Sequence, residues 1–192
     1  MENQSNNISI TMNLTLEEMY SGVTKRIKYK RKKPCTNCEK RGGCKTCSGK
    51  GITLIDSLEE IEIPKGVNTG MTLQFKRKGH YAATEKSRWS FFSKNKINTN
   101  NEIGNLIVKI KAHKHEIFSR ENTDLIYHCQ LKASEISNGP KLIAIEHLNM
   151  EVLNIEIPKN TSNGKILRIA GMGFKDIKTN QTGSLMIRLE VV

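Results

Sequence analysis

The sequence is poor in aromatic residues and has no long hydrophobic run. Phe, Trp and Tyr together make up 5% of the 192 residues, which argues against a surface on which the bases of single-stranded nucleic acid stack. No apolar stretch reaches the roughly 18 residues that cross a bilayer. Residues 1–7 are polar and contain no signal-peptide core. We therefore expect a soluble protein of a reducing, cytoplasmic compartment that does not bind a membrane.

The sequence also lacks a catalytic signature. It contains no Gly-x-x-x-x-Gly-Lys-Ser/Thr phosphate loop, and its five histidines are scattered. His113 and His115 would face one side of a strand, without an evident acid or nucleophile. We interpret His115 as a hydrogen-bonding residue of a loop or strand end. We expect a protein that is not an enzyme.

Acidic residues are almost absent from one stretch of the chain. The formal net charge is +12, and residues 24–51 contain 11 Lys or Arg but a single acid, Glu39. Such a stretch is typical of nucleic-acid binding. It also provides counter-charge for a zinc ion held by four thiolates, and we favour this interpretation because no base-reading helix accompanies the stretch. The alternative is a basic, zinc-containing nucleic-acid-binding protein.

The chain repeats itself. The segment Ile-Glu-Ile-Pro-Lys at residues 61–65 recurs at residues 155–159. The matching pairs are Gly70 with Gly164, Gly79 with Gly173 and Gly104 with Gly183, and, in the first halves, Leu14 with Leu131, Glu18 with Glu135 and Gly22 with Gly139. Apolar residues alternate in both copies, as they do in strands that bury one face. A capping box from Thr15 to Glu18 indicates a short helix that ends near Gly22.

These patterns predict a mainly β protein with two tandem homologous, β-sandwich-like domains, residues 1–111 and 112–192. The cysteine-rich module at residues 33–51 is an insertion in the first domain. Residues 81–102 are polar and rich in Asn, Lys and Ser, which indicates a mobile loop.

Four of the five cysteines form two Cys-x-x-Cys knuckles, Cys35 with Cys38 and Cys44 with Cys47. This spacing is typical of a closed, structural site for one zinc ion. Three alternatives are less favoured. The absent export signal argues against disulfides, the glycine-rich context argues against a redox pair, and the spacing argues against an iron–sulfur cluster. The fifth, Cys129, lies on an apolar strand face and is expected to be a buried small hydrophobe.

Several segments resemble DnaJ-type co-chaperones. Residues 44–51, Cys-Lys-Thr-Cys-Ser-Gly-Lys-Gly, resemble the C-x-x-C-x-G-x-G repeat of the family's cysteine-rich domain. Residues 63–66 with Gly70 resemble its I-P-x-G turn, residues 115–120 with Asp124 and Leu125 its H-x-x-F-x-R segment and the D-L after it, and residues 14–22 its L-x-L-E-E-x-Y-x-G segment. Together these segments follow the family's order over nearly the whole chain.

The sequence also departs from the family. It contains no His-Pro-Asp motif of a J domain and no Gly/Phe-rich linker. Family members usually carry four knuckles and two zinc ions, whereas two knuckles are found here, and the first lacks the C-x-G-x-G ending. The chain stops at Val192 without the helical dimerisation segment that the family often adds, so the resemblance does not predict a dimer by that route.

The resemblance implies a co-chaperone fragment that binds unfolded or extended client polypeptides in an apolar groove of the first β domain. The positions that match the groove or lie beside it are Ile8, Ile10, Ile27, Tyr29, Leu58 and Val108. Alternating apolar residues in strands are also ordinary core. Without a J domain the chain is not expected to stimulate a DnaK-type ATPase, and a DnaK-type chaperone or a separate J-domain protein is the further partner to expect.

Overall fold

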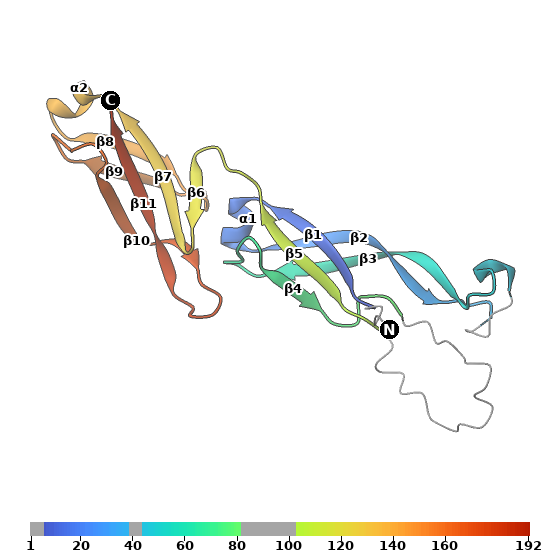
Figure 1. Cartoon of the computed structure of the whole chain (residues 1–192). Coiled ribbons are helices and arrows are strands. Elements are labelled where there is room, and N and C mark those ends of the chain that lie inside the picture. The colour runs from blue at the N-terminus through green and yellow to red at the C-terminus, as the bar shows by residue number, and fades with distance from the viewer. Residues whose placement is uncertain (1–5, 39–43, 82–102) are drawn as a thin grey trace. The chain divides into compact units, whose positions relative to one another are not determined.

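The computed structural model describes residues 6–38, 44–81 and 103–192, and it is built mainly of strands (Figure 1). The elements, in chain order, are β1 (Ile8–Leu14), α1 (Leu16–Ser21), β2 (Val23–Pro34), a 3-10 turn (Lys45–Cys47), β3 (Ile52–Ile63), β4 (Thr72–Phe75), β5 (Leu106–Ala112), β6 (Phe118–Glu121), β7 (Asp124–Leu131), α2 (Ala133–Ser137), β8 (Lys141–Glu146), β9 (Val152–Ile157), β10 (Ile166–Lys175) and β11 (Thr182–Val191). The predicted mainly β fold is confirmed.

The strands form the same arrangement twice. In the first copy β5 lies between β1 and β4, and β2 pairs with β3 in a separate two-stranded sheet. In the second copy β11 lies between β7 and β10, and β8 pairs with β9. β11 runs parallel to β7 and antiparallel to β10. Among the described residues, the second copy has one more strand, β6, which pairs with β7. The order strand, helix and four strands therefore occurs in both copies, as the sequence repeat predicts.

The short helices begin where the sequence predicts a cap. The Thr15 hydroxyl accepts a hydrogen bond from the Glu18 N–H at 3.3 Å, and the Thr15 N–H donates to the Glu18 carboxylate at 3.1 Å. This reciprocal pair is the predicted capping box. In the second copy the Lys132 N–H donates to Glu135 at 2.9 Å. Both helices are anchored by apolar side chains, since Leu16, Met19 and Ile136 are buried.

The glycines that recur in both copies allow two backbone segments to touch. A Cβ atom at Gly79 would lie 2.5 Å from the carbonyl carbon of Gly104, and the Gly79 N–H donates to Gly104 O at 2.8 Å. A Cβ atom at Gly173 would lie 2.5 Å from the carbonyl carbon of Gly183. Any larger residue would force these segments apart. The repeat thus preserves the same close approach in each copy.

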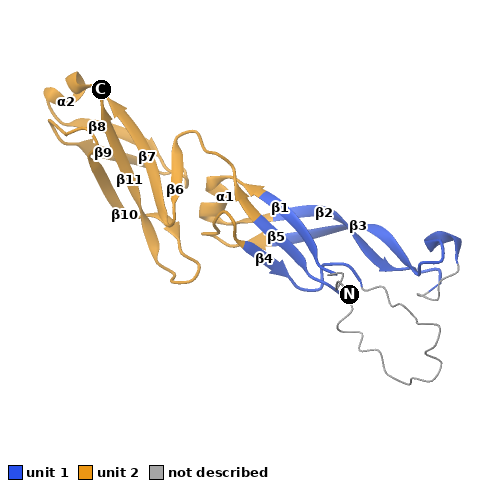
Figure 2. Ribbon diagram, in the orientation of Figure 1, with its two compact units in different colours: residues 1–12, 25–61, 72–109 blue, residues 13–24, 62–71, 110–192 orange. Residues whose placement is uncertain are grey.

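The described residues separate into two compact units (Figure 2). Unit 1 contains Lys25–Ile61 and Thr72–Lys109 together with the N-terminal residues through Met12. Unit 2 contains Asn13–Thr24, Glu62–Met71 and Ile110–Val192. Unit 2 therefore joins one end of the first copy to the whole second copy. The boundary between residues 111 and 112 stays a prediction about the duplicated sequence.

Two further expectations concern the segments around the sheets. The loop expected at residues 81–102 lies outside the described residues, except that Tyr81 forms a bridge with Ile103. Within the described ranges, no helix is long and apolar enough to cross a membrane. The cysteine-rich insertion follows β2 and leads into β3, so the two-stranded sheet carries it.

Candidate metal centre and client surface

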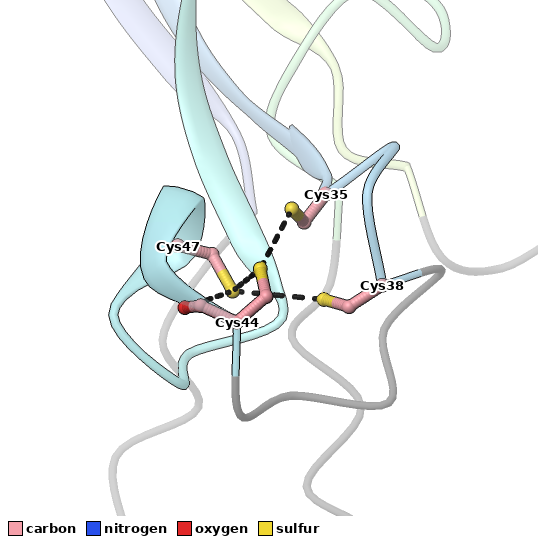
Figure 3. Close-up of side chains that lie close together, drawn as sticks. All are labelled: Cys35, Cys38, Cys44 and Cys47. Atoms are coloured by element: carbon pink, nitrogen blue, oxygen red, sulfur yellow. Dashed lines mark hydrogen bonds between the residues drawn. The ribbon is translucent and has the colours of Figure 1, made fainter.

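The four knuckle cysteines lie together at the end of the β2–β3 sheet. Their sulfur atoms are all within 4.8 Å of one another. The Cys35–Cys44 and Cys38–Cys47 sulfur pairs are each 3.6 Å apart, and the Cys44–Cys47 pair is 3.2 Å apart (Figure 3). Cys35 and Cys47 are buried, whereas Cys38 and Cys44 are partly exposed. The two knuckles thus point four sulfurs at one small volume.

This geometry fits a single metal ion. Four sulfurs bound tetrahedrally at about 2.3 Å from one ion lie roughly 3.8 Å apart, close to the separations between these sulfurs. None of these four cysteines is joined to another by a disulfide bond. The cluster could therefore hold one metal ion, and four sulfur ligands leave no open position for a substrate or water.

Hydrogen bonds around the cluster hold the two knuckles in place. The Gly51 N–H donates to the Cys47 sulfur at 3.2 Å, and the Cys35 N–H donates to Gly51 O at 2.9 Å. The Asn37 side chain donates to the Thr46 hydroxyl at 2.7 Å, which joins one knuckle to the other. Backbone donors to sulfur stabilise the thiolate form that binds a metal.

The Cys47 thiol is acidified by its neighbours. Hydrogen bonding with Cys44, together with the Gly51 N–H, lowers the pKa of Cys47 to about 6 against the opposing effect of burial. A lowered thiol pKa means that the thiolate is present above about pH 6 and takes a proton as the pH falls through that value. Cys47 can therefore bind a metal at neutral pH without first losing a proton.

Metal retention is expected to fall steeply below about pH 6. Protons compete with the metal for the thiolates, and each displaced proton changes the apparent affinity about tenfold per pH unit. Metal release to a coloured chelator, followed from about pH 8 to about pH 5, measures this dependence. Equal release at both ends of the range would contradict the assignment of these thiols as ligands.

The six candidate groove residues differ in exposure. Ile8 and Ile10 on β1 and Ile27 on β2 are half-buried. Tyr29, on the same face of β2 as Ile27, is 8% exposed, and its hydroxyl donates to Lys78 O at 2.7 Å. Val108 on β5 is fully buried, whereas Leu58 on β3 is 67% exposed. Three residues therefore offer apolar surface at partly covered positions, two lie in the core, and Leu58 points to solvent.

Two interpretations of single residues are confirmed. His115 Nδ1 accepts the N–H groups of Ile117 and Phe118 at 3.2 and 3.0 Å, so Nε2 carries the proton and donates to Glu17 at 2.9 Å. Burial would raise the pKa of Glu17, but its hydrogen bond with Thr15 and the nearby His115 lower it overall. Cys129 is 6% exposed, and burial raises the pKa of its thiol, as expected of a small hydrophobe.

The sequence reasoning missed one residue with unusual contacts. Arg120 on β6 donates hydrogen bonds to three backbone carbonyl oxygens and lies over the ring of Phe174. The only sequence signal was the position of Arg120 in the H-x-x-F-x-R segment, which marks the residue without indicating its partners.

A duplicated strand framework with a four-cysteine insertion between β2 and β3 defines a β-sheet protein with a cysteine cluster that could bind a metal ion. The model of the DnaJ C terminal domain matches residues 8–192, and the chain belongs to this family. This finding confirms the resemblance that the motifs suggest.

The curated relatives are chaperones. "Chaperone protein DnaJ" of Protochlamydia amoebophila is 29% identical over 82% of this chain and 38% of the relative. "Chaperone protein DnaJ" of Fusobacterium nucleatum is 27% identical over 97% of this chain and 55% of the relative, and "Chaperone protein DnaJ 2" of Aquifex aeolicus is 23% identical over 96% and 56%. The chain thus spans about two fifths to just over half the length of these relatives. These three relatives are named as chaperones, and none of the three is named as a nucleic-acid-binding protein.

Proposed function

We propose that the chain binds unfolded or extended client polypeptides in an apolar groove of its first β copy, without catalysing a reaction. The observation that carries the proposal is that strands at sheet edges also carry partly exposed apolar side chains. β1 is an edge strand of its sheet, and β2 belongs to a sheet of two strands. Ile8 and Ile10 lie on the first edge strand and Ile27 on the second, and all three are half-buried.

The client would be held by β-augmentation. Its backbone would pair with the N–H and C=O groups of an edge strand, and alternate side chains would contact the half-buried isoleucines. Tyr29 and Val108 would form the floor beneath them. This mode selects for extended, apolar segments rather than for one sequence, because the backbone hydrogen bonds are common to all peptides.

Charged residues on the opposite face of β2 support this assignment of faces. Arg26 pairs with Glu60 at 3.3 Å and Lys28 pairs with Asp56 at 3.2 Å, and all four side chains are largely exposed. Paired charges on a solvent face discourage unwanted edge-to-edge association of sheets. The apolar face of β2 is then the face available to a client.

The further parts of the proposal concern the metal and the partners. We propose that Cys35, Cys38, Cys44 and Cys47 hold one zinc ion with a structural role, in a reducing compartment. The 192 residues contain no His-Pro-Asp motif, so this polypeptide by itself would not stimulate a DnaK-type ATPase. A DnaK-type chaperone or a separate J-domain protein would act with it.

The test is suppression of aggregation of an unfolded client by the wild type and by Ile27→Asp. A charge beside the groove disfavours apolar burial, so Ile27→Asp is expected to require at least about tenfold more protein for the same protection. Leu142→Asp is the matched control, since Leu142 is a 63% exposed apolar residue on β8 of the second copy; it should protect as well as the wild type.

Salt separates the proposal from the rival function. Protection by apolar burial should persist at high salt, whereas binding to nucleic acid through phosphate contacts falls steeply with salt. Equal protection by the wild type and Ile27→Asp would contradict the groove. No protection by any variant, together with tight and salt-sensitive RNA binding, would favour the nucleic-acid-binding protein.

A further inference from the structure

Arg120 uses its whole guanidinium group inside unit 2. Nη1 donates to Val67 O at 2.5 Å, Nη2 donates to Gly66 O at 3.0 Å, and Nε donates to Asn122 O at 2.7 Å. The guanidinium carbon lies 3.9 Å from the centre of the Phe174 ring. Two of these hydrogen bonds go to the turn that follows β3 in the first copy, whereas Phe174 belongs to β10 of the second copy.

The turn that receives these hydrogen bonds is itself tightly seated. Gly66 has a φ of +89°, and a Cβ atom there would lie 2.0 Å from Lys175 O at the end of β10. The Gly66 N–H donates to Met19 O of α1 at 2.7 Å. A side chain at this position would meet both an unfavourable backbone conformation and a backbone atom of the second copy. The glycine therefore allows the turn to touch β10 while Arg120 holds its carbonyls.

Two other contacts join α1 of the first copy to the second copy. Tyr20 packs edge-on against His147 and Phe174, with ring centres 5.1 and 5.7 Å apart. Glu17 pairs with His115 in the segment that leads to β6. All of these residues belong to unit 2 (Figure 2). These contacts explain why unit 2 contains segments of both copies.

We propose that Arg120 is a clamp that fixes the turn at residues 64–67 of the first copy onto β10 of the second copy, so that the two copies open together rather than separately. The guanidinium suits this role because its planar fork satisfies two successive carbonyls while its face stacks on an aromatic ring. Burial lowers the pKa of Arg120 to about 10, against the opposing effect of Asp176, so the group remains charged at neutral pH.

Amide hydrogen exchange of the full chain tests the clamp. Arg120→Met is expected to speed exchange of the Gly66 N–H at least about tenfold, because the turn loses two of its hydrogen bonds, while the amides of the β8–β9 sheet keep their rates. Arg188→Met is the matched control. Arg188 lies on β11 and pairs with Glu121 at 2.9 Å on a partly exposed surface, and its loss should leave Gly66 unchanged.

A second variant makes the test independent of one substitution. Gly66→Ala should loosen the same turn, because the added methyl group would collide with β10. Both substitutions disrupt the same contact between the turn and β10, so the Gly66 N–H of the double variant should exchange no faster than that of the faster single variant. If Arg120→Met does not fold, Arg120→Lys keeps the charge but loses the fork and is expected to give the same acceleration at Gly66. Unchanged exchange at Gly66, equal acceleration in β8–β9, or additive effects would overturn the proposal.

Discussion

Replacing Cys35 with Ser is expected to abolish stable metal binding. Cys35 is one of the two buried members of the four-sulfur cluster. A serine hydroxyl does not lose its proton to become a metal ligand as a cysteine thiol does. In zinc-finger peptides the apparent free energy of structural zinc binding is about 10–16 kcal/mol, so even partial loss of one ligand has a large effect. The metal content of the purified chain should fall from one ion per chain to almost none after brief exposure to a chelator.

The damage should stay local. The knuckles are an insertion between β2 and β3, and Cys35 is tied to Gly51 by a backbone hydrogen bond. We expect limited proteolysis to cut the insertion in Cys35→Ser, while circular dichroism still reports the strands. Cys129→Ser is the matched control, because Cys129 is buried on β7 outside the cluster. A Cys35→Ser protein that keeps a full complement of metal would disprove the shared site.

Val108→Asp is expected to prevent folding of the first copy. Val108 is fully buried on β5 and lies opposite Leu73 of β4 in the register. An unpaired carboxylate there would cost several kcal/mol, a large part of the roughly 5–15 kcal/mol that stabilises a typical domain. By contrast, Ile8→Asp changes a half-buried edge position and should leave the chain folded.

Denaturant unfolding, followed by far-ultraviolet circular dichroism, distinguishes these two variants. The expected result is a folded Ile8→Asp protein with a modest shift in midpoint and a Val108→Asp protein without a cooperative transition in the first copy. Equal midpoints would mean that Val108 is not a core residue. The comparison thus separates the floor of the proposed groove from its accessible wall.

The strand framework could be predicted because it follows from local patterns. Alternating apolar residues indicate which face of a strand is covered, and the recurring glycines mark places where backbones touch. The capping box at Thr15 and the cysteine spacing are equally local. The alternation and the glycines occur in two copies, which provides an internal check, since an accidental alternation would not recur with the same helix and turns.

The exposure of the groove candidates could not be predicted in the same way. Alternation shows that Ile8 and Val108 lie on apolar faces, but it does not show how much of each face a second sheet covers. The contacts of Arg120 depend on carbonyls more than 50 residues earlier in the chain, and a backbone carbonyl leaves no mark in the sequence.

The position of β5 and β11 in their sheets has a consequence for biosynthesis. Each is the last strand of its copy to be made, yet each lies between two strands that are made earlier. A nascent chain therefore cannot close its first sheet until β5 has left the ribosome, nor its second until β11 has. Until then the earlier strands keep unpaired edges, which are prone to aggregation, and slow translation would lengthen this period. The relatives of this chain are themselves chaperones.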